Sequence, residues 1–356
     1  MIAAAIPSIW SYLLPLLSLL ALVCLVVWGL GLAVSRGWRA AIRRHPWRAL
    51  VLLLPLASLL AYGVAFAHSV WRYQQVVARQ EAARALVLEH AQTIDGIAMP
   101  AGSRLQLQRA GHPESFVEAE FAQPVMVQGI AARRLARRVS TRYDAQSHAE
   151  IGSDVLSMSV FGDGPQRVHG WSCDAALPIE FEFKGGRAVF EQCTLAAGAA
   201  HPLAIAGARL RASAGTAYTD GHIDPDRWII SLKEGQSLRL AGMWLAEASL
   251  RLHDDGTFFA LSAGTLICPH VMGPMRYPPG TQVQTIARGW QGRRPWLFTP
   301  AAHTHASYAG HADVEASSSV VQSQDGEVLS VAPSRELGVR DWMKLGPHAA
   351  LPACPD

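Results

Sequence analysis

The sequence predicts a membrane-anchored all-β protein, with two N-terminal transmembrane helices, a helical stalk and a domain of irregular β-hairpin repeats. Two long apolar runs, at 9–34 and 49–70, predict the helices. A segment rich in Ala, Gln, Glu and Arg follows at 71–95 and predicts the stalk. From residue 96 onward, short alternating segments separated by Gly-centred turns are typical of strands.

Each apolar run is long enough to cross a membrane. A helix that rises about 1.5 Å per residue needs about 20 apolar residues to span a hydrocarbon layer of about 30 Å. The first run is not a cleavable signal peptide, because no basic segment precedes it and its apolar core exceeds about 15 residues. Pro15 and Pro55 lie within the runs and predict kinks. The sequence therefore predicts two spans.

The charge of the flanking segments predicts the topology. The loop at 35–48 has no acidic residue and contains five arginines: Arg36, Arg39, Arg43, Arg44 and Arg48. The tail at 1–8 has no Lys or Arg. Because cytoplasmic loops carry the excess of basic residues, the loop is expected in the cytoplasm and both ends of the chain on the opposite side. With three Lys and no Asn, the composition is typical of a GC-rich bacterium, so we expect an inner-membrane protein with a periplasmic domain.

The domain at 96–300 shows two clear hairpins. In the first, 179–183 and 189–195 alternate around Gly185-Gly186, and in the second, 250–252 and 258–261 alternate around 254–256. Both place Gly where a hairpin turn requires a positive φ. A C-terminal extension at 301–356 contains a third candidate turn at Asp325-Gly326.

Short similar segments recur through this domain. AGSRLQL begins at Ala101, AGARLRA at Ala206, SAGTLIC at Ser262 and PPGTQVQ at Pro278, with irregular spacing. The hairpin form resembles the MORN-like repeats of bacterial proteins. The segment at 99–130, with PAGSRLQL, ESFVEAEF and PVMVQGI, is similar to a group of two-span inner-membrane proteins encoded beside type VI lipase effectors. This resemblance covers about a third of the chain and implies an immunity role, in which the periplasmic domain captures a toxin.

Five cysteines bear on the compartment. Cys24 lies in the first span, whereas four cysteines lie in the outer domain: Cys173, Cys193, Cys268 and Cys354. An even number in an oxidising compartment permits two disulfides, with three possible connectivities. Four buried thiols are the alternative.

Two basic segments are candidate partner-binding surfaces. The first consists of Arg133, Arg134, Arg137 and Arg138, which would align on one face of a helix and bind anionic lipid or an acidic partner, or be a solvated face. The second consists of Trp290, Arg293, Arg294 and Trp296. Trp and Arg dominate binding hot spots, although a Trp packed into its own domain is the alternative.

Two further clusters suggest metal or acid–base chemistry. His303 and His305 would share one face of a strand, with His311 nearby, and could bind Zn²⁺ or Cu²⁺; solvated histidines are the alternative. The second cluster, at 220–226, consists of Asp220, His222, Asp224 and Asp226. Its oxygens could bind Ca²⁺ or act as an acid–base pair, whereas a structural turn is the simpler interpretation.

The sequence favours binding over catalysis. No nucleophile elbow, phosphate-binding loop or HExxH motif occurs, and no cofactor is indicated. The net charge of +3 gives no case for nucleic-acid binding. The expected partners are the lipid bilayer and a protein, either a secreted effector or an envelope protein. An envelope scaffold and a metal-dependent periplasmic enzyme are the alternative functions.

Overall fold

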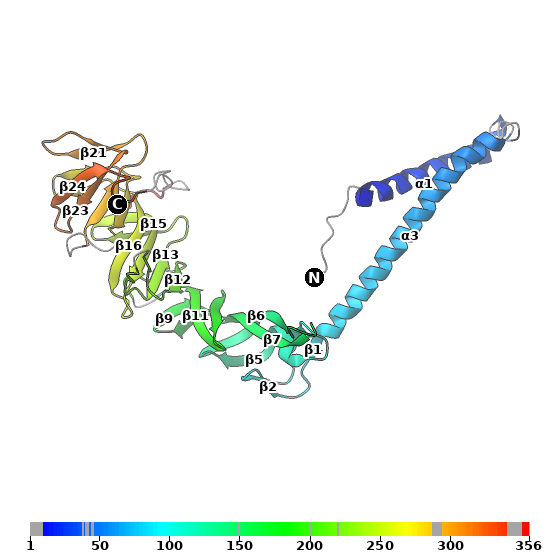
Figure 1. Ribbon diagram of the computed structural model, residues 1–356, viewed down its shortest axis with the longest axis horizontal. Coiled ribbons are helices and arrows are strands. Elements are labelled where there is room, and N and C mark those ends of the chain that lie inside the picture. Colours follow the sequence, from blue (N-terminus) through cyan, green and yellow to red (C-terminus); the bar gives the residue numbers. More distant parts are fainter. Residues whose placement is uncertain are drawn as a thin grey trace. The chain divides into compact units, whose positions relative to one another are not determined.

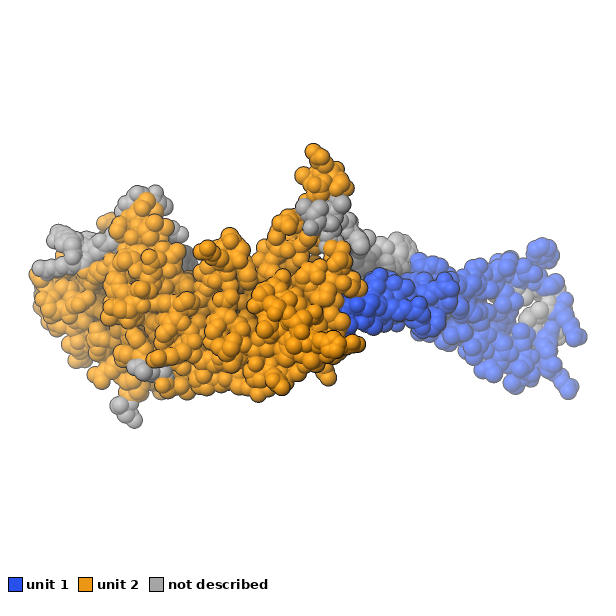
Figure 2. Space-filling view, turned by 90° about the horizontal axis from the view of Figure 1, so that it is seen from below, with its two compact units in different colours: residues 1–85 blue, residues 86–356 orange. Residues whose placement is uncertain are grey.

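The computed structural model describes residues 10–37, 39, 43, 46–148, 150–198, 201–218, 221–286, 294–339 and 351–355 (Figure 1). The chain divides into two compact units, which Figure 2 distinguishes by colour: a helical unit at 1–85 and a β unit at 86–356.

The helical unit consists of two apolar helices in mutual contact, α1 (Trp10–Val34) and α3 (Pro46–Arg84). Both are long and apolar enough to cross a membrane, over Leu13–Val34 and Leu53–Arg84. The helices approach closely at one point, because a Cβ atom added at Gly63 would lie 2.6 Å from the Cβ of Ser18. Glycine at this position therefore permits the contact, as small residues do between membrane helices.

The stalk is shorter than the sequence predicted. A helix was expected over 71–95, but α3 ends at Arg84 and strand β1 (Ala85–Val87) follows directly. The reason is tertiary structure. Leu88 is buried in the core of the β unit; its N–H donates to the carbonyl of Ser103, and its carbonyl accepts from the N–H of Gly102. Pairing and burial here outweigh the helix propensity of the segment.

The described residues of the β unit contain one sixteen-stranded antiparallel sheet, in which most strands neighbour the next along the chain. Its order begins with β1, β4 (Arg104–Leu107), β5 (Phe116–Val127), β6 (Ile130–Tyr143), β7 (Glu150–Gly162), β10 (Ile179–Lys184), β11 (Arg187–Thr194) and β12 (Arg209–Ala212). It continues with β13 (Trp228–Ser231), β15 (Met243–Leu252), β16 (Phe258–Leu266), β19 (Gln282–Thr285), β20 (Trp296–Thr299), β23 (Ser318–Gln322) and β24 (Val328–Pro333), with β14 (Ser237–Leu240) on β15.

Smaller elements accompany this sheet. They are the hairpins β2–β3 (Gln92–Ile94, Ile97–Met99) and β8–β9 (Pro165–Val168, Trp171–Asp174), the 3₁₀ turn η1 (Pro113–Ser115), and a four-stranded sheet of β17 (His270–Met272), β18 (Met275–Tyr277), β21 (His305–Tyr308) and β22 (Val314–Glu315). The C-terminal extension predicted at 301–356 is thus part of the β unit, since β23 and β24 extend the main sheet.

The register gives the main sheet two distinct faces. The core face carries buried apolar side chains in a cross-strand row that includes Leu105, Ala119, Leu135, Val160 and Ile179. The opposite face, called the outer face here, carries a second row. That row runs Gln106, Glu118, Ala136, Ser159, Glu180, Gln192, Arg211, Ile229 and Arg251. Because side chains alternate along each strand, the apolar positions form the core and the polar positions form the outer face.

The predicted hairpins are confirmed. β10 pairs with β11 through the Gly185-Gly186 turn, and β15 pairs with β16 across 253–257. The turn at Asp325-Gly326 joins β23 to β24.

Three of the four similar segments also make one kind of turn. Gly102, Gly207 and Gly280 have φ near +80°, and each donates its N–H to the carbonyl of a buried leucine. Only Gly adopts this φ readily, which explains its recurrence.

Candidate functional site

The predicted basic segment lies on strand β6, so the expected helical face is wrong. Arg137 is 2% exposed at its side chain and belongs to the core face. Its guanidinium donates to the carbonyls of Glu114 and Phe116 and to the carboxylate of Asp95 at 2.5 Å, and it lies over the Phe116 ring. These bonds satisfy a buried cation, which is a structural role.

The other three arginines of this segment are exposed. Arg133 pairs with Asp163, and Arg134 lies over the Phe161 ring. On the adjacent strand, Glu120 lies opposite Arg134 in the sheet register. Acidic residues from the turn after β7 and from β5 therefore lie beside a charge that looked uncompensated in the sequence.

The second predicted surface is only partly within the described residues, because Trp290 and Arg293 lie outside them. Trp296 is 2% exposed on β20, so it is a core residue, as the alternative interpretation held. Arg294 stacks on Phe259 with its guanidinium carbon 3.6 Å from the ring centroid, and it approaches Asp224 at 3.6 Å.

The three histidines at 303–311 do not converge. His305 lies 3.4 Å from Asp313, whereas His311 stacks on Tyr308 with ring centroids 4.0 Å apart, and His303 is exposed. Within the described ranges, no group of three His, Cys, Asp or Glu side chains has the geometry of a metal site.

The four cysteines of the β unit form two disulfides, Cys173–Cys193 and Cys268–Cys354. The first links β9 to β11. The second links the residue range 351–355 to the segment that follows β16, where Leu351 packs beside Cys268. Of the three connectivities that the sequence allowed, the structure selects this one.

The acidic segment at 222–226 is a buried ionic cluster. Asp224 and Asp226 have fully buried side chains, and both face Nη1 of Arg251, at 2.8 and 3.5 Å. The Tyr218 hydroxyl donates to Asp224 at 2.7 Å, and His222 lies 3.2 Å from the same carboxyl. Asp220 lies outside the described residues. The described parts of the segment 213–227, which are 213–218 and 221–227, are called the cover loop here and are thereby fixed over the outer face.

These contacts shift the pKa values of Asp224 and Tyr218. Burial raises the pKa of Asp224, but hydrogen bonds from Tyr218 and Arg251 and the positive charge of Arg251 outweigh it, so this pKa lies below its ordinary value. Burial and the hydrogen bond to Asp224 raise the pKa of Tyr218. The cluster is therefore a set of opposite charges that stabilise one another in their ionised forms.

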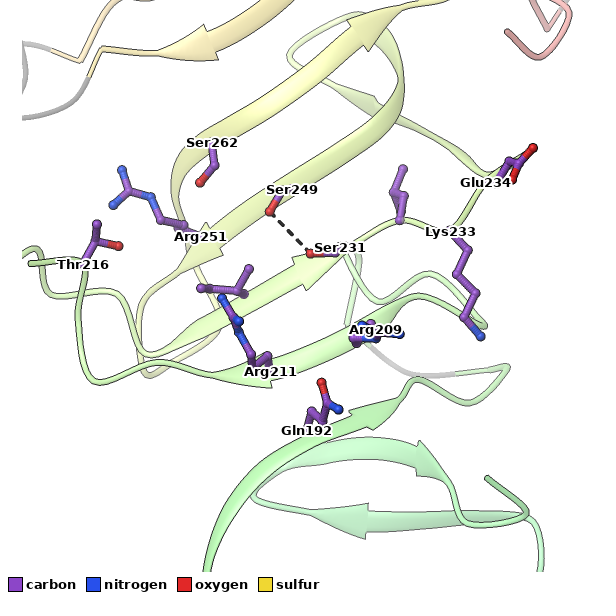
Figure 3. Close-up of a pocket in the computed structure, with 12 residues that line it drawn as sticks. Gln192, Arg209, Arg211, Thr216, Ser231, Lys233, Glu234, Ser249, Arg251 and Ser262 are labelled. Atoms are coloured by element: carbon purple, nitrogen blue, oxygen red, sulfur yellow. Dashed lines mark hydrogen bonds between the residues drawn. The ribbon is translucent and has the colours of Figure 1, made fainter. Parts of the chain in front are cut away.

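A groove opens on the outer face beside the cover loop (Figure 3). Its volume is about 600 Å³, which is within the usual range of ligand sites. The lining residues come from β11 to β16 and the intervening loops: Gln192, Arg209, Arg211, Thr216, Ile229, Ser231, Leu232, Lys233, Glu234, Ser249, Arg251 and Ser262.

Two arginines of the groove are available to a ligand. Arg209 and Arg211 lie two residues apart on β12, so both side chains leave the same face of the strand (Figure 3). Both are exposed, and neither has an ion-pair or hydrogen-bond partner for its side chain among the described residues. Arg251 lines the groove from within, and its buried Nε has no hydrogen-bond partner in the described part of the chain.

Most of the remaining polar groups of the groove are hydroxyl and amide groups, which can donate as well as accept hydrogen bonds. Ser231 and Ser249 face each other at 3.4 Å on β13 and β15, as Figure 3 shows. Lys233 and Glu234 are exposed, and among the described residues that line this groove Glu234 alone has a carboxylate. Unpaired guanidinium groups and hydroxyls form a surface that accepts anions.

The sequence did not single out this groove. A signal was present in the segment RLRA at 209–212, where arginines alternate with Leu210 in a strand pattern. Such a pattern places two cations on the face opposite the core. What it lacks is any indication that their neighbours on β11, β13 and β15 would carry no compensating carboxylate.

Comparison with known proteins gave no relative. No protein-family model matches the chain, and neither a curated protein nor a solved structure shows significant similarity.

Proposed function

We propose that the chain is a membrane-anchored, non-catalytic binding protein whose β unit binds a negatively charged protein in the groove beside Arg209 and Arg211. In this proposal α1 and α3 span the inner membrane, the arginine-rich loop is cytoplasmic and the β unit lies in the periplasm. The anchor keeps the groove at the membrane, where its partner is encountered.

The observation that carries the proposal is that Arg209 and Arg211 lie together in one groove, neither with a side-chain partner among the described residues. Exposed arginines such as Arg104 and Arg138 also have no carboxylate partner in the described part of the chain, but they do not line this groove. Two neighbouring cations on one strand repel each other, and an acidic ligand removes that repulsion. Because Arg is enriched in binding hot spots, a groove with two free arginines is suited to a charged protein segment.

The groove lining favours binding over catalysis. It contains no histidine or cysteine, and its two facing serines contact each other rather than a general base. Nucleophilic catalysis requires such a base within hydrogen-bond reach of the hydroxyl. A set of donors without a base holds an anion without transforming it.

The immunity hypothesis is a specific form of this proposal, in which the partner is a secreted toxin acting on the envelope. It predicts that expression of the protein protects a sensitive cell from the toxin encoded beside it. A lack of protection would leave the envelope scaffold as the alternative, in which the groove binds an assembly partner.

A photo-crosslinking amino acid in place of Ser231 tests the groove in cells that produce the full-length protein. We expect an adduct that disappears when Arg209→Glu/Arg211→Glu is added. The matched control, Arg104→Glu/Arg138→Glu, reverses two exposed charges elsewhere on the sheet and should leave the adduct intact. Absence of an adduct, or an adduct that survives reversal in the groove, would contradict the proposal.

Alkaline phosphatase fusions test the orientation, because this enzyme is active only in the periplasm. A fusion after Arg84 should be active, whereas a fusion after His45 should be inactive. The reverse pattern would place the groove in the cytoplasm and contradict the proposed location.

A further inference from the structure

We infer that the groove binds an extended polypeptide segment with acidic side chains at alternate positions. This inference rests on the proposed function and specifies the chemistry of the partner. Three features of the groove support it: the spacing of Arg209 and Arg211, the charge balance of the ionic cluster at its buried end and an apolar side chain between the cations.

The spacing of the two free arginines matches an extended chain. A strand rises about 3.3 Å per residue, so the Cα atoms of Arg209 and Arg211 are separated by about 6.6 Å along β12. An extended ligand has the same rise, and its alternate side chains point to one side. An acidic-x-acidic segment laid along β12 therefore places one carboxylate at each guanidinium without bending, and each pair is a charge-assisted hydrogen bond.

The buried end of the groove needs no further anion. Arg251 and Arg294 contribute two positive charges to the ionic cluster, and Asp224 and Asp226 contribute two negative charges, so the cluster is already balanced. The Nε of Arg251 is buried and therefore out of reach of a ligand in the groove. A charged ligand is thus expected to pair with the exposed Arg209 and Arg211 rather than with Arg251.

An apolar side chain separates the cations across the sheet. Ile229 lies opposite Arg211 on one side and Arg251 on the other, and it is half-buried in the groove. The methylene groups of glutamate side chains can pack on it when their carboxylates reach the arginines. A phosphate polymer offers the same charge but no comparable apolar surface. The groove therefore favours an acidic polypeptide over polyphosphate.

Peptide binding to the full-length protein in zwitterionic nanodiscs tests the inference. The probes are a fluorescent peptide in which Glu and Thr alternate and a peptide of identical composition in which Glu pairs alternate with Thr pairs, so that no two Glu are separated by a single residue. We expect the alternating peptide to bind about tenfold more tightly by fluorescence anisotropy. Equal binding, or tighter binding of the paired peptide, would overturn the inference.

Charge reversal supplies the matched control. Arg209→Glu/Arg211→Glu should lower the affinity for the alternating Glu-Thr peptide by about tenfold or more and should bind an alternating Lys-Thr peptide instead. Arg104→Glu/Arg138→Glu should bind both peptides as the wild type does. If the reversed groove does not exchange its preference, the inference is wrong.

The remaining outcomes separate the inference from the proposed function. If polyphosphate displaces the alternating peptide and binds more tightly at equal charge, the ligand of the groove is a phosphate polymer and the inference of a polypeptide is refuted. If the crosslink at Ser231 depends on Arg209 and Arg211 but the alternating peptide does not bind, the groove still binds an anionic protein and only the segment chemistry is refuted. If the crosslink and the peptide both fail, the proposed function is refuted as well.

Discussion

Replacing Asp224 with Asn should lower the stability of the β unit more than the same replacement at Asp226, the other carboxylate of the ionic cluster. The substitution keeps the shape of a fully buried side chain but removes its charge. Asp224 accepts bonds from Tyr218 and Arg251 at 2.7 and 2.8 Å, and His222 lies at 3.2 Å. Breaking one member of a buried ion pair costs about 3–5 kcal/mol, because the remaining cation stays buried. Since Asp226 still faces Arg251, we expect a loss of about 3 kcal/mol, at the lower end of that range.

Denaturant unfolding of the full-length protein in detergent, followed by tryptophan fluorescence, measures this loss. The matched control is Asp163→Asn, which removes an ion pair with Arg133 whose side chains are more than half exposed. Exposed pairs contribute at most about 1 kcal/mol. If Asp224→Asn costs no more than this control, the cluster does not hold the cover loop and the reasoning fails.

The stability difference between the wild type and Asp224→Asn should depend on pH with a defined sign. The pKa of Asp224 in the folded state lies below its ordinary value of 3.8, so the folded state favours the ionised form. The stabilisation is therefore complete above 3.8 and is lost as the pH falls through the lower folded-state pKa. The difference in stability between wild type and Asp224→Asn should shrink in that acidic window. A difference that grows on acidification would contradict the direction of the shift.

Three further perturbations test the fold. Gly63→Ala should weaken the α1–α3 contact and lower the thermal midpoint of the helical unit, because the new Cβ would clash with the Cβ of Ser18. Adding Ser18→Gly to this variant should restore the thermal midpoint. If the double variant is no more stable than Gly63→Ala, the contact is contradicted. Arg137→Gln should cost about 3 kcal/mol in denaturant unfolding, whereas Arg138→Gln should cost less than about 0.5 kcal/mol; equal costs would refute the buried role of Arg137. Cys354→Ser opens a loop with a sequence separation of 86 residues, so it should cost about 4–5 kcal/mol by chain entropy, and an unchanged unfolding curve would contradict that link.

Local patterns predicted the elements whose determinants are local. The hairpin at 179–195 was predictable because alternation and the Gly185-Gly186 turn lie within a few residues of each other. The apolar helices were predictable from run length alone. The end of α3 was not, since residues 85–95 have good helix propensity and are drawn into strands by pairing partners such as Ser103. A propensity cannot register a partner that is distant in sequence.

The site was harder to predict, because the role of an arginine depends on what covers it. Arg137, Arg211 and Arg251 all lie on strands, where the alternation of side chains places each on one face of the sheet. Arg137 is covered by Asp95 and by the carbonyls of Glu114 and Phe116, and Arg251 is covered by the two aspartates of the cover loop. In neither case does the strand itself contain the covering residues.

Arg211 shares a cross-strand row with Arg251 and is separated from it by Ile229 alone. Within the described part of the cover loop, the carboxylates pair with Arg251 and Arg294, and none pairs with Arg211 or Arg209. Two exposed cations on one strand repel each other, and such a pair adds little to stability without a carboxylate beside it. In our proposal an acidic ligand supplies that carboxylate at Arg209 and Arg211, whereas the charges of the buried cluster already pair with one another.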